Sequence, residues 1–379
     1  MPNIPTRFEA LRGGFKAFFA PPPEGVTRLT VGEPGFDTPS NVTNAMIDAV
    51  KSGDTHYTRG EGRESLCATW AEYLQHRWNI PVTGEGIVMT PGAKQALLYA
   101  MMVALDRDDE ILLLDPAWPT YAEQAVLVGA KPISVPCIQP SFRPDMVALE
   151  NAISHRTKAL LINSPNNPTG AVYTPEEIQN MVDFAIRHDL WIISDEIYAE
   201  LIWNGTPHIS PASLPGGFER TLTVMGPSKT HAMTGWRVGV LAATNEVANL
   251  VGRIQGNTCS HIPSFIMPAA EVAAKEWDSV GEFRGDYIQK RKRMMDLIEQ
   301  IPLLNAGEPE GAFYLMVDVR NTGMDAITFA ARAMEEACVQ VIPLEGIPGG
   351  EGYIRLSYAA DDDVIEEGLK RLGEWLGNQ

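Results

Sequence analysis

The 379-residue sequence is poor in cysteine, poor in basic residues and free of long hydrophobic runs. Its four cysteines are too widely spaced for a zinc clamp or a redox motif, so we expect ordinary thiols and no metal site. The 48 acidic and 30 basic residues give a formal charge of −18, which disfavours nucleic acid and anionic membranes as partners. The apolar patch FKAFFA near the N-terminus is neither a signal peptide nor a membrane span, because a lysine breaks it and three prolines follow. We therefore expect a cytoplasmic protein.

What the sequence does contain is an alternation of short apolar runs with amphipathic stretches. Seven runs have the length and the Val, Ile and Leu content of buried strands: residues 85–90, 110–115, 131–137, 158–163, 190–198, 221–226 and 237–243. Helical patterns lie between most of them, as at 93–105 and at 174–189, where Thr-Pro-Glu-Glu makes a favourable helix start. This alternation predicts an α/β fold in which a mostly parallel seven-stranded sheet lies between helices.

The length and the C-terminal pattern predict a second, smaller domain. A single core stops growing at roughly 250–300 residues, and this chain is longer. After about residue 245 long helical stretches dominate, including one over 268–300, and two strand-like runs follow at 311–319 and 352–358. We expect a large domain over residues 44–280 and a smaller α/β domain formed by residues 1–43 and 281–379.

Polar and aromatic residues gather where the predicted strands end, which is where open parallel sheets bind ligands. Asp195 ends one run, Lys229 follows another, and Trp118 follows a third. The loop NSPNNPTG follows a fourth, and PGAK, with Lys94 at a helix start, follows a fifth and suits a phosphate. Taken singly, each has an ordinary explanation as a cap, a turn or core packing. Together they fit one ligand, pyridoxal 5'-phosphate, which needs a lysine for its aldehyde, a carboxylate for its ring nitrogen and a stacking ring.

The motifs that carry these residues resemble those of the class I aminotransferases, which are fold-type I pyridoxal-phosphate enzymes, and most of all their aspartate-aminotransferase-like branch. They follow the family's order over nearly the whole chain: VGEPGFDTP (31–39), YTRGEGRESL (57–66), PGAKQAL (91–97), PAWPTY (116–121), NSPNNPTG (163–170), SDEIYAEL (194–201), SKTHAMTGWRVG (228–239) and YIRLSYA (353–359).

The resemblance implies ping-pong transfer of an α-amino group from an L-amino acid to a 2-oxo acid. Aspartate is the first expected donor, with aromatic or broad-range donors next, and 2-oxoglutarate is the expected acceptor. A C–S lyase on the same fold is the alternative enzyme, although the MTGWR segment after the lysine favours transamination. A binding or regulatory protein is the alternative outside enzymes.

The resemblance also implies a role for each matching residue. Lys229 would form the Schiff base and move the substrate proton, Asp195 would pair with the pyridinium nitrogen, and Tyr198 would bond the ring hydroxyl oxygen. Phosphate ligands would be Ala93, Lys94, Ser228, Arg237 and, from the neighbouring subunit of a homodimer, Tyr57. Trp118 would stack on the ring, and Asn167 would bond the ring hydroxyl oxygen. Trp118, Asn167 and Gly32 would also line the substrate pocket. In that pocket Arg355 would bind the α-carboxylate.

Two positions depart from the family pattern. Gly226 stands where many relatives have a serine that contacts the phosphate, and Gly256 stands near the position of an arginine that binds a distal carboxylate in some aspartate aminotransferases. The sequence therefore does not identify the residue that binds the substrate side chain. The candidates are His261, in a segment that a neighbouring subunit would lend, and the N-terminal Arg7, Arg12 and Lys16, each of which has a solvated or structural role as its alternative.

Overall fold

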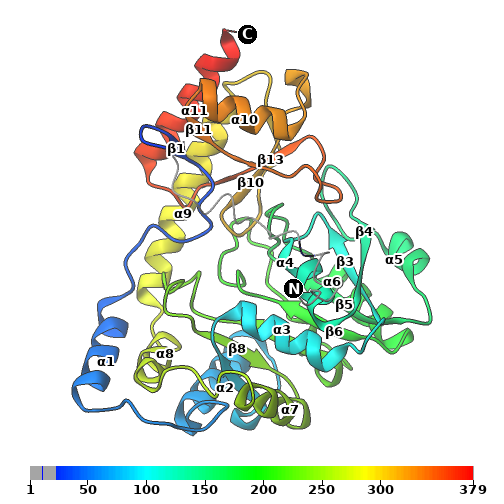
Figure 1. Ribbon diagram of the computed structural model, residues 1–379, viewed down its shortest axis with the longest axis vertical. Helices are drawn as coiled ribbons and strands as arrows, with labels where there is room; N and C mark the ends of the chain where they lie inside the picture. Colours follow the sequence, from blue (N-terminus) through cyan, green and yellow to red (C-terminus); the bar gives the residue numbers. More distant parts are fainter. Residues whose placement is uncertain (1–10, 12–22, 379) are drawn as a thin grey trace, which may run out of the picture.

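The computed structural model describes residue 11 and residues 23–378 (Figure 1). The helices are α1 (Ser40–Lys51), α2 (Glu64–Trp78), α3 (Ala93–Ala104), α4 (Thr120–Val128), α5 (Met146–Ala152), α6 (Pro175–Arg187), α7 (Asn245–Gly256), α8 (Met267–Ala273), α9 (Asp278–Ile298), α10 (Ala326–Glu336) and α11 (Asp362–Gly377). The strands are β1 (Thr27–Arg28), β2 (Ile87–Thr90), β3 (Glu110–Asp115), β4 (Lys131–Pro136), β5 (Thr157–Asn163), β6 (Trp191–Asp195), β7 (Thr221–Met225), β8 (Gly239–Ala242), β9 (Asn305–Ala306), β10 (Tyr314–Asp318), β11 (Val339–Gln340), β12 (Ile342–Pro343) and β13 (Tyr353–Ser357).

The seven strands expected from the apolar runs form one sheet in the order β2-β8-β7-β6-β5-β3-β4. Neighbours from β7 to β4 pair in parallel, and β8 is antiparallel to both β2 and β7. The prediction of a mostly parallel sheet is therefore confirmed. Because β8 runs against the others, its start lies at the same edge as the carboxyl ends of β2, β3, β5, β6 and β7, and this edge carries the site.

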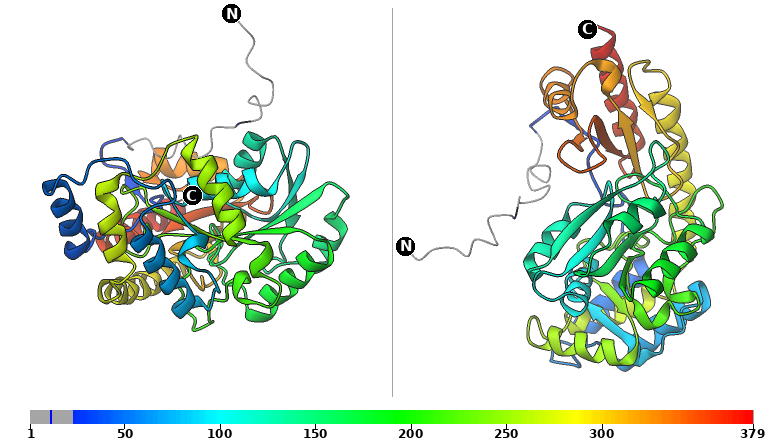
Figure 2. Two further views of the ribbon diagram at one scale, coloured as in Figure 1. Left: turned by 90° about the horizontal axis from the view of Figure 1, so that it is seen from below. Right: turned by 90° about the vertical axis from the view of Figure 1, so that its right-hand side faces the viewer.

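Both faces of the large sheet are covered by helices (Figure 2). Ile111 and Leu113 of β3 pack in a cluster with residues of α3, α4 and α7, whereas Leu112 and Leu114 pack in a second cluster with residues of α5 and α6. Successive side chains of a strand point to opposite faces, so a strand buried on both sides must be apolar at every position. This explains why the sequence runs are continuous rather than alternating.

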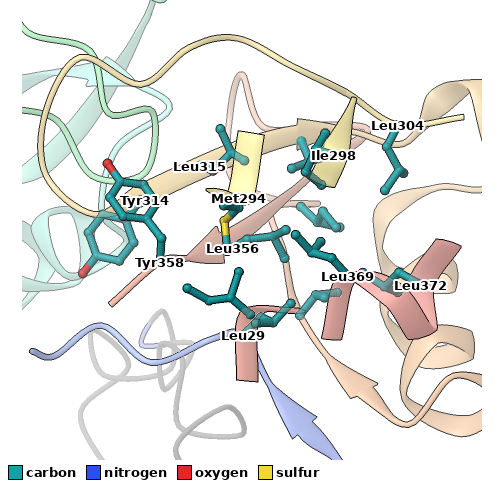
Figure 3. Close-up of a cluster of buried hydrophobic side chains, with 14 of the residues drawn as sticks. Leu29, Met294, Ile298, Leu304, Tyr314, Leu315, Leu356, Tyr358, Leu369 and Leu372 are labelled. Atoms are coloured by element: carbon teal, nitrogen blue, oxygen red, sulfur yellow. The ribbon is translucent and has the colours of Figure 1, made fainter. Parts of the chain in front are cut away.

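A smaller α/β part unites the two ends of the described chain. Strands β12, β13, β10 and β9 form an antiparallel sheet, and β1 pairs in parallel with β11, which lies more than 300 residues later. Leu29, next to β1, is buried with Leu356 of β13 and Leu369 of α11 (Figure 3). The expected smaller part from the N-terminal segment and the C-terminal third is thus present. The domain boundaries at 43/44 and 280/281 fall within α1 and α9 and stay a proposal.

The helical stretch expected over residues 268–300 is interrupted between α8 and α9. Trp277 stacks on Tyr73, with ring centroids 4.7 Å apart, and the carbonyl oxygen of Glu276 lies 2.7 Å from a ring nitrogen of His231. The Glu276 side chain accepts from the backbone N–H of Ser279, in the first turn of α9, at 3.1 Å. These contacts override the helical pattern of the sequence.

Neither a membrane-spanning helix nor a cluster of three or more potential metal-binding side chains is present in residue 11 or residues 23–378. The four cysteines are free thiols.

Candidate active site

A cavity of about 440 Å³ lies at the carboxyl edge of the large sheet, with residues of the smaller part closing its other side. Its wall contains the residues to which the resemblance assigns the cofactor or the substrate, with the exception of Tyr57, and it does not contain His261, a candidate for binding the substrate side chain. These wall residues are Gly32, Ala93, Lys94, Trp118, Asn167, Asp195, Tyr198, Ser228, Lys229, Arg237 and Arg355.

The parallel pairing of β5, β6 and β7 places the segments that carry Asn167, Asp195 and Lys229 at one edge of the sheet. Asn163 and Asp195 are neighbours in the register of β5 and β6, and Lys229 follows the end of β7. Asn163 donates to the carbonyl oxygen of Asp195 at 3.0 Å and accepts from the backbone N–H of Asn167 at 3.0 Å. The amide of Asn163 therefore ties the loop that carries Asn167 to the end of the strand that carries Asp195.

Asp195 is a carboxylate in a largely dry environment, with 3% of its surface exposed. Burial raises its pKa to about 6, against the hydrogen bonds that favour its charged form. Those bonds come from the Tyr121 hydroxyl at 2.7 Å and the Ile197 N–H at 3.2 Å. A buried carboxylate of this kind is stable in its charged form when a cation faces it, and a protonated ring nitrogen would be such a partner.

Lys229 is a half-buried lysine whose amine has a lowered pKa. Its Nζ donates to the carbonyl oxygen of Gly32 at 2.5 Å. Burial lowers its pKa to about 8; Glu33 opposes that shift, and the cations of Arg355 and Arg237 add to it. A substantial neutral fraction near neutral pH is what a nucleophile or general base requires.

The turn before α3 and the start of β8 make an anion-binding end of the cavity. Gly92 has φ +84°, and a Cβ there would overlap the guanidinium of Arg237, which itself has φ +57°. Arg237 Nη1 donates to the Thr234 carbonyl oxygen at 2.8 Å. Lys94 Nζ lies 4.8 Å from the centre of the Trp118 ring. Unpaired N–H groups at a helix start, together with two cations, suit a phosphate.

On the opposite wall, Arg355 presents its guanidinium from β13. It is 5% exposed, and its Nη1 donates to Asn167 Oδ1 at 3.0 Å while its Nη2 donates to the Thr30 carbonyl oxygen at 3.2 Å. Its guanidinium carbon lies 4.3 Å from the centre of the Tyr314 ring. A planar fork fixed in this way is suited to a carboxylate.

Sequence reasoning missed two tyrosines of the cavity wall. Tyr121 donates to Asp195, and the hydroxyl of Tyr314 lies 2.9 Å from that of Tyr198. Tyr314 stands in an apolar run that is typical of a core strand, whereas Tyr121 ends the motif PAWPTY, in which only Trp118 was given a role. The need of a buried phenol for a hydrogen-bond partner is the signal that could have marked both.

The remaining predicted residues lie elsewhere. Tyr57 is 91% exposed, and its ring packs edge-on against that of His261, with centroids 5.8 Å apart. Gly226 is not in the wall, and a Cβ there would lie 2.9 Å from the Val238 carbonyl oxygen. Gly256 has open space around it. Arg7, Arg12 and Lys16 lie outside the described residues.

Comparison with known proteins agrees with this architecture. Residues 24–372 match the family model for aminotransferase class I and II. The chain is 37% identical to aromatic-amino-acid aminotransferase 2 of Thermococcus litoralis and 37% identical to an aspartate aminotransferase of Pyrococcus abyssi, in both cases over 93% of this chain and 92% of the relative. The solved structure of Thermus thermophilus aspartate aminotransferase with maleate matches with a TM-score of 0.92 at 33% identity, over 99% of this chain and 100% of that one. The chain therefore belongs to the class I and II aminotransferase family and is an aminotransferase.

Proposed function

We propose that this aminotransferase moves the α-amino group of an L-amino acid to a 2-oxo acid by a ping-pong mechanism, with aspartate as the first donor and 2-oxoglutarate as the acceptor. Family membership implies pyridoxal 5'-phosphate as the cofactor and amino and oxo acids as substrates. The observation that carries the proposal is the meeting of buried Asp195, half-buried Lys229 and buried Arg355 in one cavity.

The residues of the cavity fit the cofactor. In a chain of charge −18, the wall carries five basic residues, namely Arg28, Lys94, Lys229, Arg237 and Arg355, against two acids, Glu33 and Asp195. Such a wall suits a ligand with a phosphate and a carboxylate. Lys94, Arg237 and Ser228, with the N–H groups of the turn at Gly92, would hold the phosphate, and Trp118 would cover the ring. When bound there, pyridoxal phosphate supplies a cationic conjugated ring that accepts electron density from the substrate Cα.

In this proposal Asp195 is the anionic partner of the ring nitrogen and Lys229 is the base. Asp195 keeps a proton on the ring nitrogen, and the hydroxyl of Tyr121 stabilises its charged form. Lys229 Nζ takes the proton from the substrate Cα, which a lowered pKa allows near neutral pH.

The remaining groups orient the reactants. Arg355 would bind the α-carboxylate and so orient the substrate in the cavity. Asn167 Oδ1 accepts from Arg355, so its Nδ2 is the end that could donate to the ring hydroxyl oxygen, to which the Tyr198 hydroxyl would also bond.

We also propose a homodimer that completes each site. Tyr57 is almost fully exposed outside its own chain's cavity and packs on His261, in the segment 255–265 expected to reach a neighbouring subunit. The cytoplasmic location expected from the sequence stays a prediction.

The test combines a covalent label with a panel of substrates. Borohydride treatment of the cofactor-loaded protein should fix the cofactor on Lys229, located by peptide mass spectrometry. Lys229→Ala should abolish turnover, whereas Lys275→Ala, at an exposed position in the turn before α9, should not. A label on another lysine would refute the assignment. Release of pyruvate and ammonia from cystathionine faster than any transamination would favour the C–S lyase instead.

A further inference from the structure

Arg28 is a cavity residue to which the proposed function gives no role. It is the last residue of β1, and the backbone pairing of this segment continues as Leu29 N–H donates to the Gln340 carbonyl oxygen at 3.1 Å. Leu29 points into the core of the smaller part, whereas Arg28 and Thr30 on either side of it line the cavity. The alternation of an extended chain therefore directs the Arg28 side chain to the substrate side.

One short segment connects Arg28 with the reacting end of the site. The Gly32 carbonyl oxygen accepts from Lys229, the Thr30 carbonyl oxygen accepts from Arg355, and the Thr30 Oγ1 accepts from Arg28 Nε at 3.0 Å. Along this wall the amine of Lys229 comes first, the guanidinium of Arg355 second and the guanidinium of Arg28 third. Both guanidiniums bond to Thr30, that of Arg355 to its carbonyl oxygen and that of Arg28 to its hydroxyl, so they stand beside the same residue of this segment. A small molecule with a carboxylate at each end can engage two guanidiniums placed in this way.

The other charged residues of the wall already have partners in the proposed function. Lys94 and Arg237 lie at the phosphate end, and Asp195 faces the ring nitrogen. Glu33 Oε2 accepts from the Thr234 hydroxyl at 2.8 Å. Resting on the proposed function, we propose that Arg28 binds the distal carboxylate of a four- or five-carbon dicarboxylic substrate while Arg355 binds its α-carboxylate.

The surroundings of Arg28 favour an anion on the cavity side. Val31 and Ile342 are apolar parts of the same wall, so a carboxylate placed there has few other polar partners. Arg28 also borders an open surface groove, where Asp361, Asp363 and Glu367 supply acidic groups. Charges attract more strongly in the less hydrated cavity than in an open groove, so a bound dicarboxylate competes well for the guanidinium.

The test compares substrates that differ in the distal carboxylate. In Arg28→Gln, kcat/KM for aspartate and glutamate should fall roughly ten- to hundredfold, as expected for the loss of hydrogen bonds to a charged group. Alanine and phenylalanine should change by less than about threefold. Arg28→Lys should be intermediate, because it keeps the charge but not the fork. Arg107→Gln, at an arginine with an 87% exposed side chain, is the matched control and should behave as wild type.

A binding measurement gives an independent readout. Succinate should raise the Tm of the cofactor-loaded wild type and should lose most of that effect in Arg28→Gln. The inference would be overturned if Arg28→Gln lost kcat/KM equally for dicarboxylic and monocarboxylic donors, or if its kcat/KM did not change. It would also be overturned if His261→Gln, and not Arg28→Gln, lost kcat/KM selectively for dicarboxylic donors. A wild type that transaminates alanine or phenylalanine but not aspartate or glutamate would overturn it as well, together with aspartate as the donor, and would leave standing only the transfer of an amino group. A wild type that transaminates nothing would overturn both.

Discussion

Replacing Gly92 by alanine should separate the anion-binding turn from the rest of the cavity. Gly92 has φ +84° and ψ 160°, a conformation that is strained by about 1–3 kcal/mol in other residues. Its new Cβ would overlap the guanidinium of Arg237 and displace it. Loss of the hydrogen bonds from Arg237 to a phosphate should cost about 1.5–3 kcal/mol, which is roughly a ten- to 150-fold rise in the Kd of pyridoxal phosphate.

The matched control is Gly205→Ala. Gly205 has φ +80° but no atom within 4 Å of a Cβ added to it, so it carries backbone strain without the collision. Urea unfolding should show a loss of stability in both variants, whereas titration of the ligand-free protein with the cofactor should show weakened binding in Gly92→Ala alone. Wild-type affinity in Gly92→Ala, or the same loss in Gly205→Ala, would refute the assignment of Arg237 to the phosphate.

Three further outcomes follow from the site. Asp195→Asn should bind the cofactor but lose about 10²–10³-fold in kcat, measured with saturating donor, because a fixed charge is removed where charge develops; near-normal kcat would contradict its role. Tyr121→Phe should raise the pKa of Asp195 further and weaken the cofactor about tenfold by titration, since a hydrogen bond to the charged form is lost. In ligand-free protein, Lys229 has a pKa of about 8 against 10.5 when unfolded, so the unfolded state binds more protons between these values. Stability relative to Lys229→Met should therefore rise with pH from about 8 to 10.5 in urea titrations, and a flat difference would refute the burial of a neutral amine.

The large sheet could be predicted from the sequence because its strands are buried on both faces. A run such as EILLLD suits a strand in a covered sheet. The helix from Pro175 has Thr174 as its N-cap, as its first residues predict, and the structure adds a capping box between Thr174 and Glu177. The break between α8 and α9 could not be predicted in the same way. It depends on Trp277 meeting Tyr73, which lies some 200 residues earlier, and no local pattern encodes that contact.

The residues of the candidate site likewise divide into those that a local pattern predicts and those that depend on distant contacts. Residues at strand ends, such as Asp195 and Lys229, could be located by pattern and by the resemblance to a family, and they line one cavity. Tyr314 and Arg28 could not, because a tyrosine in an apolar strand and an arginine at a strand end are ordinary features of a sequence. Their relevance comes only from pairings of β10 with β13 and of β1 with β11.

The pairing of β1 with β11 has a consequence for the order in which the molecule is made. All strands of the large sheet have left the ribosome before residues 339–340 are synthesised, so the half of the cavity with Asp195 and Lys229 can assemble first. The segment from Arg28 to Gly32 has its strand partner only near the end of translation, and Arg355 emerges later still. A nascent chain halted near residue 300 would thus contain the cofactor-binding wall of the cavity but lack Arg355, which is proposed to bind the substrate carboxylate.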